Sequence, residues 1–189
     1  LRPRAWFNPG LVSRNYNVPA VVGLLLLLLS LLLTSLAVVR EREVGTIEQL
    51  LVTPIRPGEL LIGKIAPNMI IDLVNMLTIL ALGIFWFRVP FRGNFWLFFA
   101  LALVYVCAGL GLGLLVSTIS QNQRQVQQLN GLIMLLGLVL SGFIFPRAAM
   151  PAAIRWIGNL FPLTYFIPIA RGIITKGTSY EHLRGEVLA

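Results

Sequence analysis

The densest group of charged and hydrogen-bonding side chains in the sequence is the segment R-E-R-E-V-G-T-I-E-Q-L-L-V-T-P-I-R-P-G-E-L-L-I-G-K, from Arg40 to Lys64. Acids and bases alternate at its start, where Glu41, Arg42 and Glu43 follow Arg40, so the segment offers both signs of charge to a partner surface. A connection between two neighbouring helices needs only about five residues, and this one has 25. The extra length indicates that the segment does more than join two elements.

The middle of this segment carries the signals of a short helix. Thr46 followed by Gln49 fits a capping box, in which each side chain bonds the backbone N–H of the other residue. Glu48 lies in the first turn, where a negative charge suits the positive helix end. Pro54 stops the helix about two turns later. Its apolar face is formed by Ile47, Leu50 and Leu51. Two interpretations fit: a surface helix that caps a helical bundle, or a docking helix through which a soluble partner transmits force.

One acid, Asp72, lies inside a long apolar run, and Asn75 follows one turn along the same helical face. A carboxylate in such a run costs about a few kcal/mol unless it is paired, protonated or open to water. Asp72 and Asn75 are therefore candidate residues of a translocation path. The alternatives are an interhelical hydrogen bond or a position close to water, because Asp72 follows Ile65 by only seven residues.

The sequence lacks the residues that most kinds of catalysis need. It has one cysteine, Cys107, and one histidine, His182, so neither an intrachain disulfide nor a metal site is expected. It has no G-x-x-x-x-G-K-[ST] phosphate loop, so the chain should not bind or hydrolyse ATP itself. An intramembrane enzyme would need paired acids or a Ser–His arrangement in its apolar runs, where Asp72 is the sole acid. The sequence therefore predicts no catalytic residue and no cofactor.

The composition indicates a membrane protein. Apolar residues make up 57% and charged residues 12%, against about half and about a quarter in soluble domains. The fifteen Lys and Arg outnumber the seven Asp and Glu, which gives a net charge of +8, and they lie between apolar runs and not in one block. They therefore indicate anchoring to lipid headgroups, and no nucleic-acid partner is expected.

Four apolar runs are predicted to cross the membrane as helices. A helix of about 20 residues spans a hydrocarbon core of about 30 Å, and only helices or closed barrels satisfy their backbone there. In the third run, Gly109 and Gly113 form a G-x-x-x-G pair, which permits another helix to approach closely. The four runs are Val18–Val39, Ile65–Phe87, Phe95–Ile119 and Leu129–Phe145.

The segment after the fourth run differs from the four predicted spans because prolines and a charge interrupt it. Ile157–Ile174 is apolar on average but contains Pro162, Pro168 and Arg171, which argue against a straight helix facing lipid. We therefore expect Pro151–Ile174 to form interfacial or re-entrant helices at the membrane surface.

The segment between the first two runs resembles the signature region of ABC-2-type permeases, the drug and polysaccharide exporter kind with a separate ATPase subunit. Later motifs also resemble that family in the same order, including S-G-F-I-F-P at Ser141–Pro146, and the likeness covers nearly the whole chain. The residues that the resemblance assigns to ATPase coupling are Arg40, Glu41, Arg42, Glu43, Gly45, Thr46, Glu48, Gln49, Leu50, Thr53 and Pro54. The match continues with Glu59, Gly63 and Lys64.

The resemblance implies an all-α polytopic membrane protein, with a short cytoplasmic coupling helix and extracytoplasmic re-entrant or interfacial helices. A full subunit would have six spans, of which this chain would hold the second to the fifth, in the bacterial inner membrane. Residues 1–17 would end an extracytoplasmic region, residues 18–150 would form the permease domain, and residues 151–189 the interfacial helices and a truncated tail. ATP and Mg²⁺ would bind on the partner ATPase, and a second permease subunit, identical or different, would complete the path.

Charge counting favours the opposite orientation, because the family topology puts five of the fifteen Lys and Arg in the cytoplasm. We follow the family topology, since the charged loop must meet a cytoplasmic ATPase. The sequence thus predicts the permease subunit of an ATP-driven ABC-2-type exporter whose substrate is open. The alternative is a non-transport membrane scaffold or a channel subunit.

Overall fold

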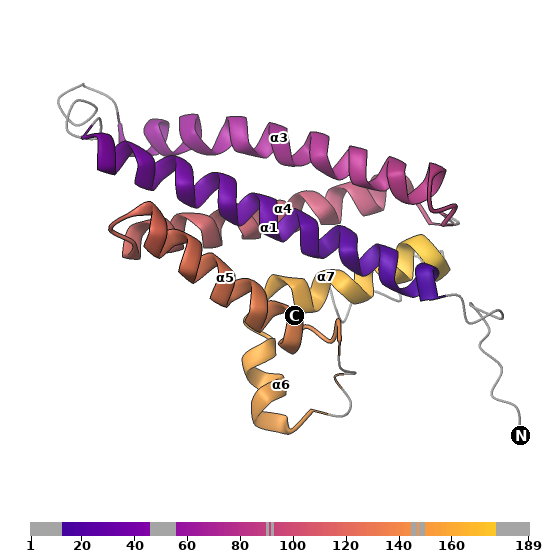
Figure 1. The fold of residues 1–189 in the computed structure, drawn as a ribbon. Coiled ribbons are helices and arrows are strands. Elements are labelled where there is room, and N and C mark those ends of the chain that lie inside the picture. Colours follow the sequence, from indigo (N-terminus) through magenta and orange to yellow (C-terminus); the bar gives the residue numbers. More distant parts are fainter. Residues whose placement is uncertain are drawn as a thin grey trace, which may run out of the picture.

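The computed structural model describes residues 13–45, 56–89, 91, 93–144, 147 and 150–176. Within these ranges every regular element is a helix, which confirms the predicted all-α fold (Figure 1). The helices are α1 (Ser13–Val44), α3 (Pro57–Phe85), α4 (Phe95–Ile119), α5 (Gln123–Leu140), α6 (Ala152–Gly158) and α7 (Pro162–Arg171), which continues as a π-helical turn (Gly172–Lys176).

Polar residues between the apolar runs determine where two of the helices begin. At the start of α4, Asn94 Oδ1 accepts hydrogen bonds from the backbone N–H groups of Trp96 at 2.9 Å and Leu97 at 3.4 Å. At the start of α5, Asn122 Oδ1 accepts one from the backbone N–H of Gln125 at 2.9 Å. Each cap satisfies N–H groups that have no partner inside the helix, so the short polar connections fix the first turns of these helices.

In the described part of the chain, three helices are long and apolar enough to cross a membrane: Asn17–Val44, Ile62–Phe85 and Phe95–Ile119. The pair Ala152–Gly158 and Pro162–Ile174 is bent by 87° and would add a fourth crossing if it formed one broken span. The predicted run 129–145 corresponds to α5, which begins earlier, at Gln123, and ends at Leu140. The four predicted spans stay a prediction.

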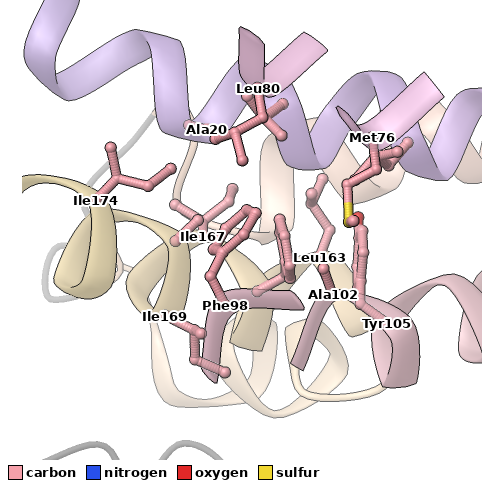
Figure 2. Packing of buried hydrophobic residues seen from close by; sticks show 14 of the residues in the cluster. Ala20, Met76, Leu80, Phe98, Ala102, Tyr105, Leu163, Ile167, Ile169 and Ile174 are labelled. Carbon is pink, nitrogen blue, oxygen red and sulfur yellow. The ribbon is translucent and has the colours of Figure 1, made fainter. Parts of the chain in front are cut away.

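The central element of the bundle is α1, which packs against α3, α4, α5 and α7 (Figure 1). A helix with apolar residues all around its axis is suited to such a place, and residues 18–39 contain no charge. The largest cluster of buried side chains lies where α1, α3, α4 and α7 meet, and Figure 2 shows members from each of these four helices. Among these are Ala20, Met76, Leu80, Phe98 and Leu163.

Glycines allow α1 and α4 to pack closely. A Cβ atom added at Gly109 would lie 2.9 Å from the Cβ of Ser30, and one added at Gly113 would lie 2.9 Å from the Cβ of Thr34. Side chains do not pack at such distances, so the two helices touch at these points because both residues lack a Cβ. The close approach predicted for the G-x-x-x-G pair is confirmed, and the partner helix is α1.

The segment after α5 folds back in two parts. The helix α6 is mostly exposed and projects from the bundle, whereas α7 lies against α1 and α4 (Figure 1). Phe166 of α7 is buried, and its ring stacks on Tyr105 of α4 with 4.1 Å between the ring centroids. The Tyr105 hydroxyl in turn donates a hydrogen bond to the backbone oxygen of Gly23 at 2.8 Å. These contacts make α7 part of the core, and its place in the membrane as an interfacial or re-entrant helix stays a prediction.

Candidate functional site

Three consecutive side chains at the end of α1 contact three different helices. Successive residues of an α-helix point about 100° apart, so Glu41, Arg42 and Glu43 face three directions. Glu41 faces α3, Arg42 faces the end of α4, and Glu43 faces the start of α5. We call this group the polar clamp; it consists of Glu41, Arg42 and Glu43 with their partners Lys64, Ser120 and Gln123.

The first contact of the polar clamp is an ion pair between Glu41 and Lys64 Nζ of α3. The two side chains are 36% and 16% exposed, so the pair is partly shielded from water. Residues 46–55, which include the predicted docking helix, lie between these two positions in the sequence. The ion pair therefore joins the two ends of the charged loop.

The second contact attaches α1 to α4. The Arg42 guanidinium donates a hydrogen bond to the backbone oxygen of Ser120 at 3.0 Å. Ser120 is the C-cap of α4. The last carbonyl groups of a helix have no partner inside it and carry the negative end of the helix dipole, so a cation is favourable there.

The third contact attaches α1 to α5. Glu43 Oε1 accepts a hydrogen bond from the backbone N–H of Gln123 at 2.8 Å, and Oε2 accepts one from Gln123 Nε2 at 2.5 Å. Gln123 is the first residue of α5, where free backbone N–H groups attract an anion. The sequence predicts only a polar connection at Ser120 and Gln123, because nothing local links either residue to α1.

Two more residues of the predicted coupling set are described. Arg40 is exposed in the last turn of α1. Gly45 has a φ of +79°, which L side chains rarely adopt, and its N–H bonds the backbone oxygen of Arg42 at 3.2 Å. Gly45 thus ends α1. The rest of the set, and with it the predicted docking helix, lies outside the described residues: Thr46, Glu48, Gln49, Leu50, Thr53 and Pro54.

Asp72 lies in the contact between α3 and α1. It is fully buried, and its Oδ2 accepts a hydrogen bond from the Ser30 hydroxyl at 2.6 Å. This is the interhelical hydrogen bond that the sequence allows as an alternative to a translocation path. Asn75 is partly buried one turn further along α3. A role of Asp72 and Asn75 in a path stays a prediction.

A second group of polar contacts on α1 is not predicted from the sequence. Thr34 Oγ1 accepts a hydrogen bond from Asn68 Nδ2 of α3 at 3.5 Å, and Ser35 Oγ accepts one from Asn130 Nδ2 of α5 at 2.8 Å. Polar side chains act as local glue between helices in apolar surroundings. The available signal was that Ser30, Thr34 and Ser35 interrupt an otherwise apolar leucine tract.

The described residues define a class: a helical, multi-pass membrane protein whose helices are joined by charged side chains at the end of α1. The family model described as ABC-2 type transporter matches residues 6–175. The chain belongs to the ABC-2 type transporter family.

Three relatives show how much of a whole subunit the chain represents. The probable multidrug ABC transporter permease YbhS of Escherichia coli is 36% identical over 179 residues, covering 94% of this chain and 47% of that protein. YbhR of the same organism, described in the same words, is 33% identical over 94% of this chain and 48% of its own length. The inner membrane transport permease YhhJ of Escherichia coli is 31% identical over 96% of this chain and 49% of its own length. The chain spans about half the length of these relatives. No solved structure gives a significant match.

Proposed function

We propose that this chain is the membrane-spanning part of the permease subunit of an ATP-driven exporter in the bacterial inner membrane. The family match and the relatives described as multidrug and inner membrane transport permeases support the proposal. The observation that carries it is the polar clamp. It ties α1, α3, α4 and α5 together at the point where α1 runs into the charged loop.

The polar clamp supplies a physical route from the loop to the helices. A partner that moves the loop pulls on Gly45 and on the end of α1. Because the clamp residues of α1 hold α3, α4 and α5, the displacement reaches all four helices. Charged contacts of this exposure contribute only about 0.2–1 kcal/mol each, so the clamp links the four helices without adding much to the stability of the bundle.

The energy source in this proposal is a separate ATPase subunit that binds ATP and Mg²⁺. The proposal gives this chain no ATP site, because its sequence has no phosphate-binding loop. The loop 46–55 would dock on the ATPase, and a second permease subunit, identical or different, would complete the path. We assign Asp72 and Asn75 to the polar side of that path, because carboxylates inside membrane spans mark functional sites.

The test uses the full-length subunit produced together with the ATPase encoded beside it. Glu48→Lys reverses a charge in the loop, and a mispaired charge at a docking surface costs about 2–5 kcal/mol. We therefore expect membrane levels like those of the unaltered protein and at least about tenfold less copurified ATPase, which corresponds to about 1.4 kcal/mol.

The matched control is Arg88→Glu, a charge reversal at an exposed residue just beyond the far end of α3. It should leave copurification unchanged. Equal amounts of ATPase with both variants and with the unaltered protein would show that the loop is a cap of the bundle and would refute the docking proposal.

A further inference from the structure

The contact between α1 and the start of α5 has a consequence for how movement is transmitted. We infer that Gln123 is a positioning residue, and that its pairing with Glu43 makes α5 follow the movement of the ATPase-facing loop. The inference rests on the proposed function. It concerns a residue outside the charged loop, since α3 and α4 lie between that loop and Gln123 in the sequence.

The geometry at Gln123 distinguishes it from the other two clamp partners. Glu43 uses both carboxylate oxygens, one on the backbone N–H and one on the side chain of Gln123. Hydrogen bonds to a charged acceptor are shorter and about twice as strong as neutral ones. The bond to the backbone holds the first turn of α5 itself. By comparison, Lys64 contacts Glu41 through the tip of a long flexible side chain.

A second bond makes the first two turns of α5 follow α1. Asn130, two turns after Gln123, donates a hydrogen bond to Ser35 of α1 at 2.8 Å in the buried interior. Between these points only Val126 of α5 is also buried. The stretch 123–130 is therefore held to α1 at both of its ends, so a shift of the α1 end moves it as a unit.

The remainder of α5 packs against the bundle along one edge. Its buried residues in the second half are Gly137 and Leu140. On the outer side Leu132 and Leu135 are 51% and 59% exposed in this chain. The two bonds at its start are thus the contacts that link the position of α5 to the end of α1.

The pair can be broken and rebuilt by exchange of the two side chains. Gln123→Ala removes one bond, and Gln123→Glu puts two carboxylates together while keeping a residue that suits a helix N-terminus. Glu43→Gln combined with Gln123→Glu restores both bonds, because the new amide accepts from the backbone N–H and donates to the new carboxylate. Gln121→Ala is the matched control, since Gln121 has an exposed side chain in the same turn.

The experiment measures whether α5 responds to nucleotide in the full-length complex with its ATPase. Gln128→Cys, exposed on α5, is the labelling position, in a background in which Cys107 and any other cysteine are replaced. Its rate of reaction with a maleimide is compared without nucleotide and with ATP plus vanadate. We expect a ratio of at least about twofold in the otherwise unaltered complex, since trapping selects one state. The ratio should fall part of the way in Gln123→Ala, which keeps the backbone bond to Glu43, and close to one in Gln123→Glu. It should recover in the exchanged pair and persist in Gln121→Ala.

A purely structural role of Gln123 would lower the amount of complex and leave the ratio intact. The inference is overturned if the complex lacks a nucleotide-dependent ratio, if both single variants keep it, or if the exchanged pair does no better than the single variants. Failure of the proposed function is a separate result, because it appears as absence of ATPase from the purified unaltered complex.

Discussion

At one end of α1 the neighbouring helices are joined by charged side chains, and at the other end by aromatic rings. The first end is the polar clamp. At the second end, the rings of Phe91 and Phe98 meet edge to face with 6.1 Å between their centroids. The ring centroids of Phe98 and Phe166 are also 6.1 Å apart, and Phe166 stacks on Tyr105. We call these four rings the aromatic cluster; its core members Phe98 and Tyr105 appear in Figure 2.

The difference concerns how each end responds to a change. Aromatic rings fill space on all sides, and removal of one leaves a cavity whose cost is large. The polar clamp depends on direction, and each of its contacts is weak once water can reach it. The aromatic cluster is thus suited to hold α4 and α7 in place, while the clamp links α1 to its neighbours and contributes little to stability.

The largest loss of stability is expected at the aromatic cluster. Phe166→Ala removes a ring that is 2% exposed, and it should lower the free energy of unfolding by about 3 kcal/mol or more. The measurement is the thermal unfolding of the purified full-length protein in detergent. Phe85→Ala is the control, since Phe85 is 83% exposed. If both variants unfold at the same temperature, the aromatic cluster does not anchor α7.

An intermediate effect is expected between the two ends, where α4 touches α1. Gly113→Leu must push the backbones apart, because a Cβ there would lie 2.9 Å from the Cβ of Thr34. The expected cost is about 1–3 kcal/mol. Gly111→Leu is the matched control on the same helix, since a Cβ at Gly111 meets no atom within 4 Å. Equal stability of the two variants would contradict the close approach of α1 and α4.

The smallest effect on stability is expected at the polar clamp. Lys64→Met removes the ion pair with Glu41 and should cost about 1 kcal/mol or less. Its effect on coupling should be larger: ATP hydrolysis by the assembled complex should respond less to the exported compound than in the unaltered complex. A loss of stability as large as that of Phe166→Ala would mean that the two ends do not differ in the way described.

The sequence predicts much of this bundle because lipid leaves few choices. Long uncharged runs must be helices there, and a pair of glycines four residues apart marks a close helix contact. It does not predict the polar clamp, because Glu43 and Gln123 are separated by 80 residues and meet only through the packing of α1 against α5. It also leaves the roles of Glu41 and Arg42 open, because a pattern of alternating charges does not show whether the side chains contact a partner protein or other helices of the same chain. The sequence leaves several roles open for Asp72, because the partner that decides between them, Ser30, lies in another helix.

The most direct test of the central claim compares the two ends of the bundle in the intact complex. A photo-crosslinking amino acid is placed at Val44, 68% exposed beside the polar clamp, or at Trp86, 79% exposed beyond the far end of α3. After illumination of membranes that contain the full-length subunit and its ATPase, covalent adducts are identified by mass. We expect an adduct with the ATPase from Val44 and none from Trp86. An ATPase adduct from Trp86, or its absence from Val44 in a complex that copurifies, would contradict the assignment of the charged end as the coupling surface.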